Sequence, residues 1–150
     1  MSGGRPEESG EDRIILLVDD YADTREVLAR LLRAEGYWPI SVKGPLDAIE
    51  FMVKTPPALV ISDIKMPGMD GLSFCERIRS DPRWTGVRVV LFSVEEATRG
   101  AALRAGADAF IQKDSMDWAV LRMEILRLIG PGTLGKTLPN VRPPGVQDAG

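Results

Sequence analysis

The sequence contains no histidine. Histidine is the general base of Ser/His/Asp and Cys/His catalytic sites and a frequent zinc ligand, so these classes of site are excluded. For the same reason the chain cannot phosphorylate itself on a histidine. Any chemistry that this protein carries out must therefore depend on carboxylates, hydroxyls and lysines.

Disulfides, long apolar segments and excess positive charge are missing as well. Cys75 is the single cysteine, so the chain forms no internal disulfide, which fits a reducing compartment. No apolar run approaches the roughly 20 residues that span a bilayer, and the polar N-terminus has no signal-peptide core. We therefore expect a cytoplasmic protein without membrane insertion. The net charge of -3 argues against direct binding to nucleic acid.

The length and composition suit one globular domain, because the chain has 150 residues, of which 44% are hydrophobic. Residues 1–12 are rich in Gly, Glu and Ser, and we predict that they are disordered. Residues 131–150 are rich in Pro and Gly, which predicts an unstructured tail. The folded domain is therefore expected at residues 13–130.

Between these segments, patterns typical of buried strands alternate with patterns typical of helices. The predicted strands are Arg13–Val18, Pro39–Val42, Ala58–Ser62, Val87–Phe92 and Ala109–Ile111. The predicted helices are Ala22–Glu35, Leu46–Val53, Leu72–Arg79, Glu95–Ala105 and Asp117–Ile129. In the first helix, one face carries Val27, Leu28, Leu31 and Leu32. Trp84 is expected in the loop after the third helix. This alternation predicts an α/β fold: a doubly wound, flavodoxin-like parallel sheet of order 2-1-3-4-5 with five helices.

Polar side chains stand where the predicted strands end. Asp19 and Asp20 follow the first strand, Asp63 the third and Lys113 the fifth, and Ser93 follows the fourth. In a doubly wound sheet these positions meet in one crevice at the carboxyl ends of the strands. Three neighbouring carboxylates repel one another, and a divalent cation together with one lysine would relieve that repulsion. Magnesium prefers oxygen ligands, so the sequence predicts Mg²⁺ as the cofactor.

The ordered set of motifs resembles the receiver domains of two-component response regulators. The resemblance covers roughly residues 13–129 and rests on LLVDD at 16–20, SDIKMPGMDGL at 62–72, LFS at 91–93 and AGADAFIQK at 105–113. It implies that Asp63 is the phosphoacceptor, whose carboxylate attacks phosphorus to give an acyl phosphate. It also implies slow self-dephosphorylation of a protein that is not an enzyme in the usual sense.

The resemblance implies a role for six further positions. Asp20 matches a direct magnesium ligand, and Asp19 matches a metal-site residue that acts largely through water. The backbone carbonyl of Lys65 matches the third protein ligand, and Asp63 itself belongs to the metal site as well. Lys113 matches the lysine that pairs with the phosphoryl oxygens, and Ser93 the hydroxyl that moves toward the phosphoryl group. Phe110 matches the aromatic switch that turns inward with that hydroxyl, although a purely structural role as a core aromatic is the second interpretation.

The sequence departs from the family pattern at three places. Asp114 follows Lys113, where receivers commonly have proline; we expect a trans bond there, and Asp114 is a candidate either to cap the last helix or to compete with phosphate for Lys113. Fewer residues than usual separate Ser93 from Lys113, and the deletion must lie in the loop or helix after Ser93. Val94 stands where alanine or glycine is common, so its branched side chain should narrow access to Asp63.

Two more side chains are expected beside the approach to the phosphoryl group. Lys65 lies two residues after the acceptor and Glu95 two residues after the hydroxyl, and their opposite charges allow an ion pair across the mouth of the pocket. Together with Val94, this pair would obstruct the path of water. The sequence therefore predicts slow loss of the phosphoryl group and slow labelling by small donors.

The resemblance also implies partners. The phosphoryl group would come from a sensor histidine kinase or a histidine phosphotransfer protein, and the output would be a phosphorylation-dependent change in binding to an unknown protein target; a weak homodimer is compatible with this. Only 21 residues follow Ile129, fewer than the roughly 50 that an output domain needs. We therefore expect either a stand-alone receiver without an output domain or a part of a longer protein.

Two other classes of function are weighed against this one. The first is a phosphorylation-independent interaction module with a receiver fold, which the presence of all the acidic, hydroxyl and lysine residues argues against. The second is a phosphatase that uses an aspartyl phosphate on a similar sheet, but the segment reads Asp63-Ile64-Lys65 and lacks the D-x-D nucleophile motif of such enzymes. Phosphoryl transfer to Asp63 from a separate donor remains the leading hypothesis.

Overall fold

A computed structural model of the protein describes residues 14–115 and 117–132. The predictions for residues 1–12 and for most of the tail lie outside the described residues. The strands are β1 Ile14–Val18, β2 Trp38–Val42, β3 Leu59–Asp63, β4 Arg88–Ser93 and β5 Ala109–Gln112. The helices are α1 Ala22–Ala34, α2 Pro45–Lys54, α3 Gly71–Arg79, α4 Arg99–Arg104 and α5 Trp118–Ile129, with 3₁₀ turns η3 Pro82–Trp84, η4 Glu96–Thr98 and η5 Lys113–Ser115.

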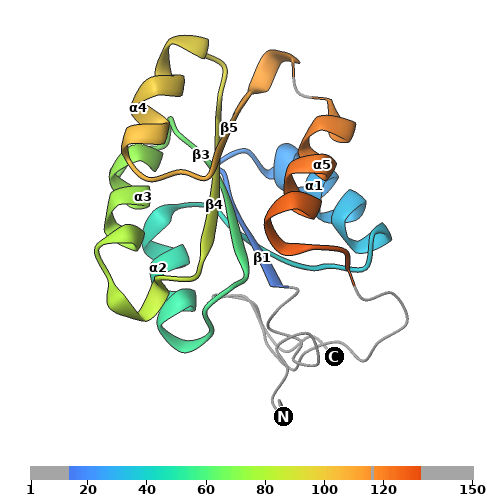
Figure 1. Ribbon diagram of the computed structural model, residues 1–150, viewed down its shortest axis with the longest axis horizontal. Coiled ribbons are helices and arrows are strands. Elements are labelled where there is room, and N and C mark those ends of the chain that lie inside the picture. Colours follow the sequence, from blue (N-terminus) through green and yellow to red (C-terminus); the bar gives the residue numbers. More distant parts are fainter. Residues whose placement is uncertain (1–13, 116, 133–150) are drawn as a thin grey trace.

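All five strands are parallel and lie in the order β2-β1-β3-β4-β5, which confirms the predicted topology. Helices α2, α3 and α4 cover one face of the sheet, and α1 and α5 cover the other (Figure 1). Because both faces are covered, the central strands are buried along their whole length, as their continuous apolar sequences predicted. The carboxyl ends of the strands meet at the upper edge of the view.

The core consists of two layers, one on each face of the sheet. Alternate residues of β1 divide between them: Ile14 and Leu16 pack toward α2 and α3, whereas Ile15 and Leu17 pack toward α1 and α5. This follows from the two-residue period of a strand. None of the helices in the described part of the chain has both the length and the apolar character that crossing a membrane requires.

The buried face of α1 differs from the prediction. Leu28, Ala29 and Leu32 are buried, whereas Val27 is 54% exposed and Leu31 is only partly buried. At about 100° per residue, the buried arc is centred between residues 28 and 29, and Val27 points almost directly away from it. The apolar residues alone did not define this face, because a small residue, Ala29, occupies part of it.

Two segments after α3 also differ from the prediction. Trp84, expected in a loop, lies in the 3₁₀ turn η3 and is 1% exposed, because the turn folds its ring into the core layer under α3. The helix predicted at Glu95–Ala105 is divided into the turn η4 and the six-residue helix α4. The shortening inferred between Ser93 and Lys113 thus accompanies an α4 of fewer than two turns.

The residue that caps the last helix is Asp117, and not Asp114, for which capping was one of the two predicted roles. The side chain of Asp117 accepts a hydrogen bond from the backbone N–H of Ala119 and caps α5, so Asp114 does not perform that function. Asp114 itself is exposed. The described residues contain no cis peptide bond, which agrees with the trans bond expected between Lys113 and Asp114.

Candidate functional site

Three aspartates meet at the carboxyl edge of the sheet: Asp19 and Asp20 follow β1, and Asp63 is the last residue of β3. One carboxylate oxygen from each of Asp19, Asp20 and Asp63 lies within 4.8 Å of the others. Asp19 and Asp63 are buried, at 2% and 6% exposure, and Asp20 is exposed. The cluster therefore has two buried carboxylates and one that faces solvent.

Local hydrogen bonds fix the segment that carries Asp19. Its Oδ1 accepts from the backbone N–H of Tyr21 at 2.9 Å, and its backbone carbonyl accepts from the Arg25 guanidinium at 2.6 Å. The first bond makes a tight turn between β1 and α1, and the second ties that turn to the helix. The acidic doublet is therefore held in place by the start of α1.

The segment that carries Asp63 is fixed by close backbone packing. The N–H of Ile64 donates to Phe92 O on β4, and the N–H of Gly71, the first residue of α3, donates to Ile64 O at 2.7 Å. A Cβ at position 71 would lie 2.3 Å from the Asp63 carbonyl oxygen, so this position requires glycine. This role of Gly71 was not predicted, although its place at the end of the motif that starts at Asp63 was the available signal.

Lys113 joins the two buried carboxylates. Its Nζ lies 3.2 Å from Asp19 Oδ2 and 3.3 Å from Asp63 Oδ2, and its side chain is 17% exposed. Burial raises the pKa of Asp19, and the Tyr21 N–H and the Lys113 ammonium only partly oppose this shift. Burial also disfavours the charged form of Lys113, but Asp19 and Asp63 outweigh it and raise the pKa of the lysine. The fold therefore favours the charged form of Lys113 and disfavours the ionised form of the Asp19 carboxyl.

This donor set fits a magnesium ion. Three carboxylates supply the hard oxygen ligands that Mg²⁺ prefers, and the exposed Asp20 leaves a side open for the waters that Mg²⁺ usually retains. The excess negative charge that remains after Lys113 is counted also favours a cation. Lys65, whose backbone carbonyl was predicted as a further ligand, lies in the loop directly after β3.

Ser93 lies at the end of β4, beside the carboxyl end of β3. The strand register pairs Asp63 with Phe92, the residue before Ser93. Ser93 is 1% exposed, and its Oγ accepts a hydrogen bond from the Glu95 N–H at 3.1 Å. The hydroxyl is thus held by the loop after β4, and any movement of Ser93 must also break or shift that loop contact.

The predicted ion pair at the mouth of the pocket is present. Lys65 Nζ lies 3.1 Å from Glu95 Oε2, and both side chains are largely exposed. Val94, between Ser93 and Glu95, is 47% exposed, and its carbonyl accepts from the Gln112 side chain at 2.7 Å. The pair links the loop after β3 to the loop after β4, so it spans the two segments that flank Asp63.

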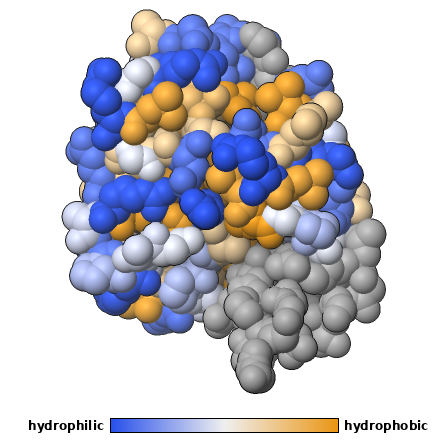
Figure 2. All heavy atoms as spheres, in the orientation of Figure 1, coloured by the Kyte–Doolittle hydropathy of each residue, from blue (hydrophilic) through white to orange (hydrophobic). Residues whose placement is uncertain are grey.

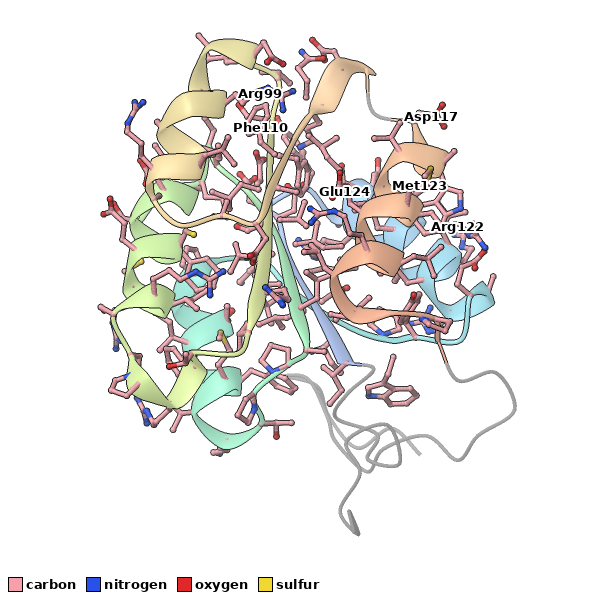
Figure 3. The ribbon with its side chains drawn as sticks, viewed as in Figure 1. Arg99, Phe110, Asp117, Arg122, Met123 and Glu124 are labelled. Carbon is pink, nitrogen blue, oxygen red and sulfur yellow. The ribbon has the colours of Figure 1, made fainter. Side chains whose placement is uncertain are left out.

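Phe110 lies on β5, inside the core layer, at 5% exposure. The Arg99 guanidinium lies over its ring, at 4.8 Å from the centroid (Figure 3). Glu96 forms an ion pair with the same guanidinium. The resemblance implied a ring that turns inward, but in this structure the ring is already inside. Its burial agrees with both interpretations of Phe110, so the switch role stays a prediction.

A groove of about 590 Å³ runs beside this ring, between α4, β5 and α5, and is lined by Glu96, Arg99, Phe110, Ile111, Gln112, Val120 and Glu124. The two flanking helices carry exposed apolar side chains: Leu103 on α4 and Val120 and Met123 on α5, at 49%, 49% and 68% exposure. Figure 2 shows apolar atoms gathered among charged ones on this face. Exposed apolar and charged side chains therefore lie together on this face.

The sequence is similar to those of known response regulators. The family model described as the response regulator receiver domain matches residues 15–124. BaeR of Escherichia coli O6:H1, a transcriptional regulatory protein, is 34% identical over 66% of this chain, which spans 41% of BaeR. The chain therefore spans less than half the length of this relative.

Solved structures of similar sequence have the same fold. The receiver domain of a signal transduction histidine kinase from Syntrophus aciditrophicus is 32% identical, with a TM-score of 0.73 over 83% of this chain and 97% of that one. The response regulator TrrA from Thermotoga maritima, solved with Mg²⁺ and BeF, is 29% identical, with a TM-score of 0.70 over 77% of this chain and 98% of that one.

Proposed function

The chain belongs to the family of response regulator receiver domains, and we propose that it accepts a phosphoryl group on Asp63 from a histidine kinase or histidine phosphotransfer protein. A receiver domain is a signalling module rather than a conventional enzyme. The single observation that carries the proposal is the contact of Lys113 with Asp63 beside two further carboxylates. This arrangement combines a nucleophile, a fixed positive charge and a cation site.

The chemistry follows from the needs of phosphoryl transfer, which depends on positioning and on stabilisation of developing charge. Asp63 is the nucleophile that attacks phosphorus, and the bond between phosphorus and the donor breaks on the opposite side. Lys113 neutralises charge on the transferring oxygens, and Ser93 is the hydroxyl that binds the product. Asp19, Asp20, Asp63 and the backbone carbonyl of Lys65 would hold a magnesium ion, which would supply positive charge against the negative charge that develops on the transferring oxygens.

The proposal is tested by mass spectrometry of the intact protein after incubation with acetyl phosphate or phosphoramidate and Mg²⁺. We expect the addition of one phosphoryl group, which is lost when EDTA replaces Mg²⁺ and in Asp63→Asn. Asp47→Asn, at the start of α2, is the matched control and should be labelled like the wild type. No labelling by either donor or by a histidine kinase would instead favour a phosphorylation-independent interaction module.

We propose that the output is a change in protein binding at the groove between α4, β5 and α5. Ser93 and Phe110 lie on the two adjacent strands that lead from the acidic site to this groove, which supports a connection between them. A phosphoryl group can shift such a surface only if it binds one state better, and Ser93 supplies that differential contact. The downstream target is a protein whose surface complements exposed apolar groups and paired charges.

The first prediction is that Mg²⁺ stabilises the fold. A ligand that binds only the native state raises its stability by RT ln(1 + [L]/Kd), which is about 2.7 kcal/mol at a hundredfold excess over Kd. Millimolar Mg²⁺ should therefore raise the melting temperature by several degrees, as measured by calorimetry. Asp20→Asn should remove most of the increase, whereas Asp47→Asn should keep it. An equal increase in Asp20→Asn would mean that the ion binds elsewhere.

The second prediction concerns the lifetime of the phosphorylated protein. The Lys65–Glu95 pair contributes only about 0–1 kcal/mol to stability, because it is exposed. A tenfold change in rate requires about 1.4 kcal/mol of barrier, so obstruction of the water path by this pair and Val94 can still slow hydrolysis several-fold. We therefore expect slow decay of the wild-type phosphoprotein.

Decay is followed by intact mass after removal of the donor. Val94→Ala and the double variant Lys65→Asn/Glu95→Ala should each shorten the lifetime several-fold, and both should be labelled faster by acetyl phosphate. Lys54→Asn, on α2, is the control and should leave the lifetime unchanged. If wild-type decay is already fast, or if none of these substitutions alters it, these side chains do not control access.

A further inference from the structure

We propose that the ring of Tyr21 positions Lys113 for phosphoryl transfer, a role that rests on the function proposed above. Lys113 Nζ lies 5.6 Å from the centroid of the Tyr21 ring and 4.9 Å from that of Phe92. The same ammonium contacts the carboxylates of Asp19 and Asp63. Two rings and two carboxylates thus surround one charged group.

The two rings differ in how they reach Lys113. Phe92 belongs to β4 and is 1% exposed, so it forms a fixed wall of the core. Tyr21 is 66% exposed and stands between β1 and α1, at the rim of the acidic site. A large aromatic side chain with that exposure contributes little to the core. We therefore assign to this exposed ring a role in holding Lys113, which it contacts.

The backbone places the ring independently of the side chain. The Tyr21 N–H donates to Asp19 Oδ1, and the Tyr21 carbonyl accepts from the N–H of Arg25 in the first turn of α1. Both bonds involve only main-chain atoms of Tyr21, so they persist when the side chain is replaced. A substitution at this position therefore removes the ring and leaves the turn that holds Asp19.

The ring acts on the orientation of Lys113 and not on the carboxylates. The face of an aromatic ring attracts a cation within about 6 Å of its centroid, and the attraction grows as water is excluded. The exposed Tyr21 supplies one such ring at the rim of the site, and the buried Phe92 supplies the other from the core. Lys113 is thereby kept against Asp63, where the phosphoryl oxygens arrive. Because the lysine side chain is already ordered before the donor binds, its conformational entropy is not lost during the reaction.

The test compares Tyr21→Phe, Tyr21→Leu and Tyr21→Ala in the full chain, with acetyl phosphate and Mg²⁺ as the probe. The attraction of an exposed ring corresponds to about a two- to fivefold change in rate. Leucine and alanine should slow phosphorylation by that factor, whereas phenylalanine, which retains the ring, should match the wild type. Equal rates for all four proteins, or a phenylalanine variant as slow as leucine, would overturn the proposal.

A second measurement does not depend on phosphorylation. Ring currents shift the side-chain methylene protons of Lys113 away from the NMR positions of an exposed lysine such as Lys54. Part of this shift should disappear in Tyr21→Leu and remain in Tyr21→Phe. If the wild type accepts no phosphoryl group, the function proposed above fails, and the NMR comparison still decides whether the ring holds Lys113: a shift unchanged in Tyr21→Leu refutes it.

Discussion

Replacing Lys113 with methionine should lower the rate of phosphorylation by acetyl phosphate about 100-fold or more. Lys113 is the cation that contacts both buried carboxylates, at 3.2 and 3.3 Å, and its pKa is raised, so it is charged at neutral pH. Removing a fixed group that stabilises developing charge in a water-poor site costs about 10²–10³ in rate. Methionine has a similar length and no charge, so the change isolates the electrostatic contribution.

Two further variants make this experiment specific. Lys113→Arg keeps the charge, but the planar guanidinium does not fit a slot that leaves only 17% of the lysine side chain exposed, so we expect an intermediate rate. Lys54→Met removes an exposed lysine on α2 and should label like the wild type. The rates are measured by intact mass at a fixed Mg²⁺ concentration. A Lys113→Met variant labelled within about threefold of the wild type would show that another group supplies the charge.

Lys113→Met should also be less stable without Mg²⁺. Burial already raises the pKa of Asp19, which means that the fold stabilises the ionised form of this carboxyl less well than water does. Without the ammonium, Asp19 and Asp63 repel each other with less compensation, and the carboxylates are costly to keep ionised. Mg²⁺ supplies the missing charge, so the ion should raise the melting temperature of the variant more than that of the wild type.

The sequence predicted the sheet order and the meeting of Asp19, Asp20, Asp63 and Lys113, because the end of a parallel strand determines where the next side chain lies. It also predicted the Lys65–Glu95 ion pair, since both residues hold fixed offsets from strand ends. These predictions depend on local position along a strand, which the sequence records directly. The rest depends on how elements approach one another in space.

Trp84, Gly71 and Tyr21 illustrate that second kind of feature. The burial of Trp84 results from a 3₁₀ turn that folds back under α3, and nothing in the neighbouring residues alone distinguishes it from a surface loop. The need for glycine at position 71 arises from the Asp63 carbonyl oxygen, eight residues away in sequence. The contact of Tyr21 with Lys113 joins the first loop to the last one. No periodicity in the sequence encodes these contacts.

Replacing Arg79 with alanine should lower the free energy of unfolding by about 2–3 kcal/mol, although it lies at the edge of the sheet opposite the acidic site. The Arg79 guanidinium donates to Gly106 O at 2.8 Å, to Val87 O at 2.6 Å and to Asp108 Oδ2 at 2.7 Å. It thus joins the end of α3 to the start of β4 and to the turn before β5. Arg79 and Asp108 are mostly buried, at 26% and 21% side-chain exposure.

The size of the effect follows from what remains after the substitution. Asp108 would keep the N–H of Val89, at 2.8 Å, but lose its short ion pair, and two carbonyl oxygens would lose their donors. Breaking a fully buried pair costs about 3–5 kcal/mol, and partial exposure reduces that cost. For a domain of this size, the melting temperature should fall by about 10 °C.

Arg88→Ala is the matched control for Arg79→Ala, because Arg88 also pairs with Asp108, at 3.4 Å, but is 51% exposed. An exposed pair contributes about 0–1 kcal/mol, so this variant should melt within a few degrees of the wild type. Both proteins should still be phosphorylated at the wild-type rate at temperatures where they are folded, since neither change touches the carboxyl edge of the sheet. Equal destabilisation by the two substitutions would mean that Asp108, and not the three-way contact of Arg79, holds these segments together.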